Sequence, residues 1–252
     1  MEPVFTFQDK RVLVQSYGNA LFYDPKQENL EEPAKTIEFL AQQVKAQNVL
    51  WQRLANDTHR TRRFRVGNRD AQPFSRSRLC TINNERLDGV VLNKRGDCVA
   101  FSTRDCPTLI LYSTQGGPIA VMHCSRSSLQ GIDLGDTEIS VIKHGLQICR
   151  RWWGNREHIR GVITLGIAPE HFPNDRYPEI VSMLEKRWGP EVIKDKERST
   201  IDLVALIKAQ LAHYGISASQ VTHDGLDTFS DPRLASVRAK RGGHNLILVT
   251  YT

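Results

Sequence analysis

The sequence predicts a mixed α+β fold in one compact domain covering residues 1–252. Short apolar runs bounded by turn residues are typical of strands, and longer segments with apolar residues every three or four positions are typical of helices. Neither an internal repeat nor a linker-like tract divides the chain. Hydrophobic residues make up 40% and charged residues 25%, as in ordinary globular proteins.

The N-terminal part predicts a β-hairpin and then a helix. The strands are expected at residues 11–17 and 20–24, with the Gly-Asn pair between them as the turn. A helix is expected over residues 29–52, where apolar residues recur at helical spacing. These residues are Ile37, Leu40, Val44 and Val49. The polar, Arg-rich residues 56–78 that follow predict a loop or an exposed strand.

Residues 87–124 predict a β-meander, because four apolar runs alternate with the turn sequences KRGD and TQGG. A helix is expected over about 134–153, capped by Asp136 or Thr137. The remaining expected elements are a strand at 160–169, helices at 177–189 and 200–215, and a strand at 244–252.

The cysteine content indicates a protein of a reducing compartment, and the net charge is compatible with binding of anionic partners. The net charge of +6 suits phosphates without requiring them. The five cysteines are an odd number and form no CxxC pair, so a disulfide framework is not expected. No apolar run is long enough to cross a membrane, and the N-terminus has no secretion-signal profile, so a cytoplasmic location is expected.

A possible metal site lies within TRDCPTLILYSTQGGPIAVMHCSRSS, residues 103–128. Cys106 precedes one apolar run and His123 ends the next, so the two side chains can meet at one end of a hairpin. Catalytic zinc takes about three protein ligands, and His59, in the polar loop, is the third candidate. Spacing alone favours a buried core cysteine and a hydrogen-bonded histidine over a metal site, and it does not exclude Cys98 or Cys124.

The same segment resembles the core of the bacterial laccase-domain proteins, first called multicopper polyphenol oxidases and later described as purine nucleoside phosphorylases. TRDCP resembles the family's "TADC-P-L" element, and His123 opens the counterpart of its "HAGWRG" element. VITLGIAPEHF and SVRAKRGGHNLILV resemble two further family segments. The resemblance implies layered α/β/β/α sheets and helices, and a metal bound by His59, Cys106 and His123.

The sequence departs from the family pattern around these residues. HAGWRG is replaced by HCSRSS, so Arg126 stands one position before the family's Arg. The Cys of the family's "GPC" element is replaced near Glu170 and His171. These changes leave open a metal-binding protein that has lost its activity.

The resemblance implies a zinc-dependent purine nucleoside phosphorylase with adenosine deaminase activity, acting on adenosine, inosine and methylthioadenosine. Zinc-bound water can attack the adenine ring while a carboxylate moves protons. Cys106, Asp105 and Arg126 are the candidate catalytic residues, although Asp105 equally fits a structural role. Arg62 and Arg238 are candidates for holding the phosphate.

Two other functions remain as alternatives. Copper-dependent phenol oxidation needs several metal centres, whereas the chain has 8 His and no HxH pair. Nucleic-acid binding through the basic run HRTRRFRVGNR lacks a recognisable binding motif. The expected partners are therefore a purine nucleoside and phosphate.

Overall fold

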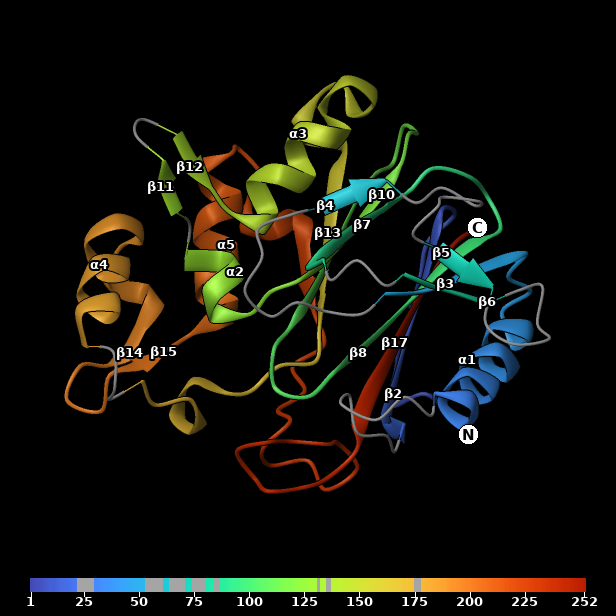
Figure 1. Ribbon diagram of the computed structural model, residues 1–252. Helices are drawn as coiled ribbons and strands as arrows, with labels where there is room; N and C mark the ends of the chain where they lie inside the picture. The colour runs from blue at the N-terminus through green and yellow to red at the C-terminus, as the bar shows by residue number, and fades with distance from the viewer. Residues whose placement is uncertain are drawn as a thin grey trace.

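Two β-sheets lie face to face between layers of helices in the computed structural model of this protein (Figure 1). The structure describes residues 1–21, 30–52, 61–63, 71–73, 80–83, 87–130, 132–134, 137–174 and 178–252. The fold is mixed α+β, as the sequence predicts.

Within these residues the larger sheet has the strand order β1-β2-β17-β8-β3-β6-β5. Its strands are β1 (Phe5–Gln8), β2 (Val12–Leu21), β17 (His244–Tyr251), β8 (Asp97–Thr103), β3 (Asn48–Gln52), β6 (Cys80–Asn83) and β5 (Ala71–Pro73). The first and last parts of the chain therefore pair side by side, because β17 lies between β2 and β8.

The smaller sheet has the order β16-β13-β9-β10-β7-β4 over the same part of the chain. Its strands are β16 (Val221–His223), β13 (Ile159–Thr164), β9 (Thr108–Ser113), β10 (Ile119–His123), β7 (Gly89–Leu92) and β4 (Thr61–Arg63). Two short hairpins lie outside these sheets: β11 (Ile132–Leu134) with β12 (Thr137–Ile139), and β14 (Ile193–Asp195) with β15 (Thr200–Ile201).

Three apolar clusters separate the layers and confirm the α/β/β/α order. Helix α1 (Glu31–Gln43) packs on the outer face of the larger sheet, and one cluster lies between them. The second fills the space between the sheets. The third lies between the smaller sheet and the helices α2 (Arg126–Gln130), α3 (Val141–Trp153), α4 (Pro178–Trp188) and α5 (Leu203–His213).

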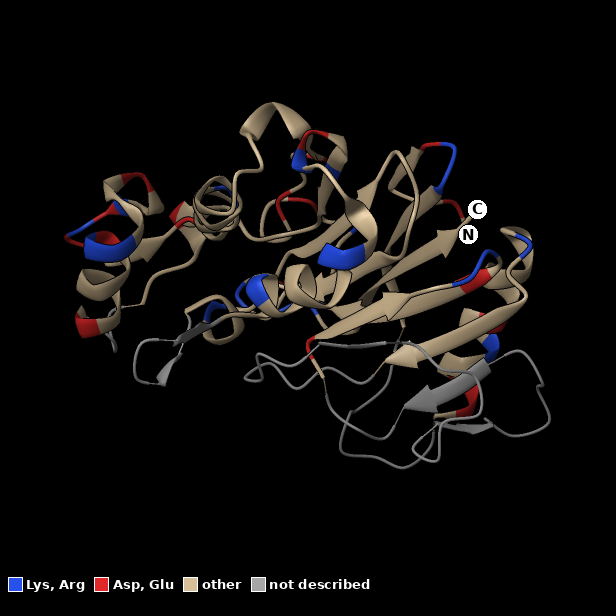
Figure 2. Ribbon diagram, turned by 90° about the horizontal axis from the view of Figure 1, so that it is seen from above, with Lys and Arg blue, Asp and Glu red and all other residues tan. Residues whose placement is uncertain are grey.

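Side chains of β10 alternate between the two faces of the smaller sheet. Ala120 and Met122 contact the helix side, whereas Ile119 and Val121 contact the other sheet. Successive side chains of a strand point to opposite faces, so His123 points toward the space between the sheets. Charged residues gather in the helices and connecting loops, and most strand residues are uncharged (Figure 2).

The predicted N-terminal hairpin is wrong in its turn. Gly18 and Asn19 lie inside the continuous strand β2, and the real hairpin joins β1 to β2. Residues 18–20 oppose the single residue Asn245, so the Gly-Asn pair forms a bulge instead. Asn19 has a positive φ of 45°, a conformation that Asn tolerates in bulges as well as in turns.

Three further predictions need correction. The helix predicted over residues 29–52 ends at Gln43, and Val49 belongs to strand β3. The apolar residues of β3 happen to continue the helical spacing, and for this reason the prediction ran too far. The helix predicted from about residue 134 begins at Val141 and is capped by Ser140, whose hydroxyl accepts from the Lys143 amide at 3.2 Å. Thr137 lies in β12, and Asp136 is outside the described residues.

The predicted meander is correct in its strands but not in their pairing. β8 joins the larger sheet, whereas β7, β9 and β10 join the smaller one. Residues 104–107 therefore cross from one sheet to the other, which a local pattern does not reveal.

Among the described residues, no helix is both long and apolar enough to cross a membrane. Cys98, Cys106, Cys124 and Cys149 are free thiols.

Candidate metal centre

His123 is fixed by Asp88 at the end of the space between the sheets. Its ring Nδ1 lies 2.9 Å from the Asp88 carboxylate, and its backbone amide donates to the Asp88 carbonyl at 2.7 Å. The His123 and Asp88 side chains are 1% and 0% exposed. A carboxylate on Nδ1 leaves Nε2 available to a metal, which is the usual arrangement around metal-binding histidines.

Cys106 comes to His123 from the crossing between the sheets. The Cys106 carbonyl accepts from the Thr103 hydroxyl at 3.0 Å, and the next carbonyl, of Pro107, accepts from the Cys124 amide at 2.8 Å. These bonds tie the crossing to the ends of β8 and β10. The Cys106 side chain is within hydrogen-bonding reach of His123. The structure thus brings these two candidate ligands together.

The charge state of His123 follows from these contacts. Burial disfavours the protonated ring, but hydrogen bonds with Asp88 and Cys106 outweigh burial and raise the pKa of His123 to about 9. A metal ion at the thiol and Nε2 would displace protons from both groups, because ligands bind metals in their deprotonated forms.

The third candidate ligand, His59, lies outside the described residues. The described residue nearest to it in sequence is Thr61, which pairs with Gly89 beside Asp88. Arg62 pairs with Val90 on the same strand, and its side chain also lies outside the described part. Strand β4 thus lies beside β7 and begins opposite Gly89, the residue that follows Asp88.

Cys98 and Cys124, which spacing left open, lie in apolar surroundings. Cys98 belongs to the cluster under α1, and burial raises the pKa of its thiol to about 12. Cys124 belongs to the cluster under the other helices, and burial raises its pKa well above the ordinary value. Burial of this kind disfavours the thiolate that a metal requires.

Both carboxylate oxygens of Asp105 accept hydrogen bonds from the C-terminal part of the chain. Oδ1 accepts from the Thr228 hydroxyl at 3.0 Å, and Oδ2 accepts from the amides of Val237 and Arg238 at 2.9 and 3.2 Å. These contacts fit the structural alternative. Asp105 thereby anchors the segment carrying Arg238 beside Cys106.

Arg126 and Arg238 approach one short segment from two sides. Arg126, at the start of α2, donates to the Asn174 side chain at 3.2 Å. Arg238 donates to the Pro173 carbonyl at 3.3 Å, and its guanidinium lies 5.2 Å from the centre of the Phe172 ring. Arg126 is three residues from His123 and the Arg238 amide is tied to Asp105, so the backbone of both arginines lies near the Cys106–His123 pair, and both guanidinium groups contact residues 172–174.

The altered HCSRSS turn is internally bonded. The Ser125 hydroxyl accepts from the Ser128 amide at 3.1 Å, and the Ser128 hydroxyl donates to the His123 carbonyl at 3.0 Å. These bonds hold the backbone of His123 although the sequence of the turn differs from the family's.

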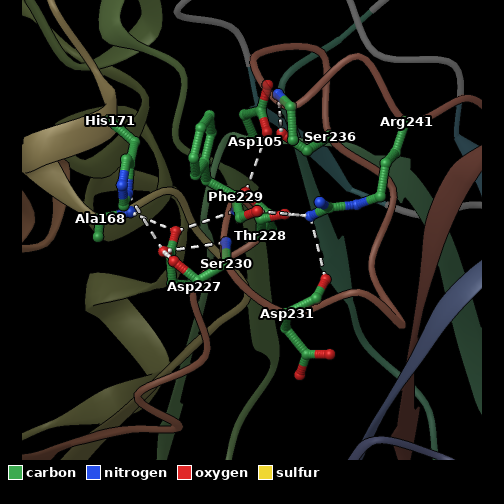
Figure 3. A network of polar contacts seen from close by, with 11 residues as sticks. Asp105, Ala168, His171, Asp227, Thr228, Phe229, Ser230, Asp231, Ser236 and Arg241 are labelled. Carbon is green, nitrogen blue, oxygen red and sulfur yellow. Dashed lines mark hydrogen bonds and ion pairs between the residues drawn. The ribbon is translucent and has the colours of Figure 1, made fainter.

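The C-terminal segment beside the site is braced by Arg241 and Asp227 (Figure 3). Arg241 donates to the carbonyls of Thr228, Phe229, Asp231 and Leu234. Asp227 accepts from the Ala168 amide at 2.9 Å and lies 3.3 Å from Nδ1 of His171, whose ring stacks on Phe229 at 4.0 Å. The segment's backbone is thus fixed next to Asp105.

Sequence reasoning missed Asp88. Its signal is weak: one acidic residue before an apolar run, in LDGVVLN. Only the pairing of β7 with β10 reveals its role, because that pairing places Asp88 beside His123.

The described residues supply part of a zinc ligand set. Cys106 and His123 are donors that zinc prefers, and the Asp88 carboxylate on the far nitrogen suits a ligating histidine. No group of three His, Cys, Asp or Glu side chains that could hold an ion occurs within the described part of the chain. The donors present fit zinc, and a third must come from elsewhere, as His59 would provide.

Comparison with known proteins identifies relatives over nearly the whole chain. The family described as "Multi-copper polyphenol oxidoreductase laccase" matches residues 20–251. Three crystal structures have similar folds. The hypothetical protein YfiH of Bacillus licheniformis has a TM-score of 0.71 at 16% identity, covering 96% of this chain and 93% of its own.

The protein NMB0706 of Neisseria meningitidis has a TM-score of 0.69 at 14% identity, with 98% of each chain covered. YlmD of Geobacillus stearothermophilus has a TM-score of 0.66 at 16% identity, with 99% of each chain covered. No curated protein matches the sequence significantly.

Proposed function

Because the chain belongs to the multi-copper polyphenol oxidoreductase laccase family, we propose that it is a zinc-dependent purine nucleoside phosphorylase that also deaminates adenosine. The substrates would be adenosine, inosine and methylthioadenosine. The observation that carries the proposal is the contact of the half-buried Cys106 with the buried His123, whose Nδ1 is held by Asp88. Free thiols fit our expectation of a cytoplasmic enzyme.

The chain's residues would divide the work between metal binding and substrate binding. Cys106, His123 and His59 would hold the zinc ion, which when bound supplies an activated water. Asp88 orients the His123 ring. Asp105 positions the crossing and the Arg238 segment on either side of the site.

Phosphorolysis also needs a cationic group for phosphate. Arg126 and Arg238 both carry fixed positive charge near Cys106 and His123, and guanidinium groups bind phosphate oxygens in pairs. Their partners include the neutral oxygens of Asn174 and Pro173, which a phosphate could replace. The described geometry therefore favours these two arginines as the phosphate-binding pair.

The test combines elemental analysis with incubation of adenosine and inosine, with and without phosphate. Base and ribose 1-phosphate indicate phosphorolysis, and inosine formed from adenosine indicates deamination. Cys106→Ala should lose bound zinc, whereas Cys149→Ala, a buried thiol in α3, should keep it. Unchanged zinc in the Cys106 variant would refute the ligand assignment, and zinc without either product would favour the inactive alternative.

The family description itself favours a second candidate, copper-dependent phenol oxidation. Such an oxidase would show copper in the purified protein and oxygen uptake with a phenol. A single donor pair among the described residues suits one metal ion better than the several copper centres of that chemistry.

A further inference from the structure

Thr108 carries an unpartnered hydroxyl beside the candidate metal centre. It is the first residue of β9, its side chain is fully buried, and its Oγ1 has no hydrogen-bond partner among the described residues. Its strand neighbours are His123 on β10 and Thr164 on β13. Directly opposed side chains on neighbouring antiparallel strands lie about 5 Å apart, so Thr108 stands between these two.

Thr108 faces the space between the sheets. Ile110 and Tyr112, two and four residues further along β9, belong to the cluster between the sheets, and Leu109 and Leu111 belong to the helix side. By the same alternation on β13, Val162 places Thr164 between the sheets. The space between the sheets is thus lined by polar side chains at this end and by apolar side chains further along.

A chain of hydrogen bonds starts at Thr164. Its hydroxyl donates to the Asp224 carboxylate at 2.7 Å and lies 2.6 Å from the Ser16 hydroxyl of the larger sheet. A hydroxyl has one proton and two lone pairs, so Ser16 donates and one lone pair of Thr164 remains for another donor. The hydrogen bonds end at Asp224, whose carboxylate lies 3.6 Å from Nε2 of His223, and the His223 side chain is 27% exposed.

We propose that Thr108 binds a buried water that joins the metal centre to Thr164, Asp224 and His223. Leaving a buried hydroxyl unpaired costs about 1–3 kcal/mol, and buried waters typically pair such groups with about three hydrogen bonds. Thr108 and the free lone pair of Thr164 supply two of them. The site thereby gains a second connection to solvent through the protein interior, separate from the side on which Arg126 and Arg238 lie.

This path would carry protons, a role that rests on the proposed function. Deamination of adenosine moves protons within the site as ammonia leaves. The water and the Thr164 hydroxyl each accept one proton and release one, so both end unchanged. Because ammonia leaves as ammonium at neutral pH, the reaction takes up one proton overall, and this proton passes from solvent through His223, the Asp224 carboxylate, the Thr164 hydroxyl and the water to the site. Thr108 acts as a positioning residue for the water.

High-resolution crystal structures test the water directly. In the wild-type protein and in Thr108→Ser we expect an ordered water within hydrogen-bonding distance of the hydroxyl. In Thr108→Val, which keeps the side-chain shape, we expect that water to be missing. A wild-type structure with no water at Thr108 would overturn the proposal.

Kinetics and zinc content test the role of the water. Thr108→Val should lower kcat for deamination about tenfold and alter its solvent deuterium isotope effect, with zinc content unchanged. Thr108→Ser should restore both. Thr200→Val removes another buried, unpartnered hydroxyl, on β15, and should leave kcat unchanged.

An unchanged kcat in Thr108→Val would refute the proton path. If the wild-type protein itself converts no nucleoside, the proposed function and the path both fail, and the crystal structures still decide the water site.

Discussion

Asp88 shows how one buried residue can decide the chemistry of its neighbour. The carboxylate fixes the His123 ring through Nδ1 and directs the other nitrogen to the side where Cys106 lies. An outer carboxylate of this kind also makes the ring a better metal ligand.

Replacing Asp88 should therefore weaken metal binding. Asp88→Asn should lower zinc affinity about 10- to 100-fold, measured by competition with a chromophoric chelator. Asp97→Asn is the matched control, since Asp97 is also buried but hydrogen-bonds with Asn48 at the start of β8. Equal affinities in the two variants would remove Asp88 from the site.

The arginine pair makes a separate prediction. Arg126→Gln and Arg238→Gln should each raise KM for phosphate about tenfold, because each removes a charged hydrogen-bond donor. Deamination needs no phosphate and should change little. Phosphorolysis and deamination rates, measured on the same preparations, distinguish this result from general damage to the site. Loss of both activities in parallel would contradict a phosphate role.

At the scale of single residues, the sequence predicts Cys106 and His123 as ligands because both border clear apolar runs, and the structure places their side chains in contact. It could not select among the carboxylates. Asp105 is conspicuous next to Cys106, yet its oxygens hold Thr228, Val237 and Arg238. Asp88 is 35 residues from His123 and meets it only through strand pairing.

Among the elements, the bulge in β2 connects the edge of the larger sheet to the site. The Asn245 side chain, opposite the bulge, accepts from the Asn19 amide at 3.0 Å and donates to the Arg104 carbonyl at 3.1 Å. Arg104 begins the crossing that carries Cys106. The irregular part of β2 thus helps to place the thiol.

Within this bulge, the close approach of the Arg233 backbone requires glycine at position 18. A Cβ at Gly18 would lie 2.4 Å from the Arg233 carbonyl oxygen, whereas a Cβ at Gly242 would meet nothing within 4 Å. Gly18→Ala should lower the free energy of unfolding by about 1–3 kcal/mol, since backbone must move. Gly242→Ala should change it by less than about 0.5 kcal/mol. Urea denaturation of both variants measures the difference, and equal midpoints would contradict it.

Element prediction succeeded where local pattern alone determines structure. The helices near residues 178–188 and 203–213 and the last strand agree with the sequence. It failed where the structure of a segment depends on the strand with which that segment pairs. The Gly-Asn pair suits a turn or a bulge equally, and β17 makes it a bulge. The sequence predicts that β8 and β9 pair with each other, but they pair with other strands and belong to different sheets.

For the whole molecule, His244 makes stability depend on pH. Burial and the nearby Arg104 charge lower the pKa of His244 to about 4, from an ordinary value near 6.5. Between pH 6.5 and about 4, His244 is protonated in the unfolded chain but stays neutral in the folded protein. The contribution of His244 to stability is therefore complete above pH 6.5 and declines as the pH falls to about 4.

The decline attributable to His244 should reach about 3 kcal/mol. His244→Gln should flatten the pH dependence of the unfolding free energy over this interval, whatever its effect at neutral pH. His213→Gln, at an exposed residue ending α5, should leave the pH dependence unchanged. Denaturant titrations between pH 7 and 4 make the comparison, and identical slopes in the His244 variant and wild type would contradict it.

The crossing at residues 104–107 has a consequence for assembly. It supplies the thiol from between the sheets, while the imidazole belongs to the smaller sheet alone. In the proposed site the β9–β10 hairpin of the smaller sheet brings both donors together, because Cys106 lies two residues before β9 and the Pro107 carbonyl accepts from the Cys124 amide at 2.8 Å. A zinc ion bound in the proposed site would therefore hold the crossing against the end of this hairpin, and so fix the point at which the chain passes from the larger sheet to the smaller one.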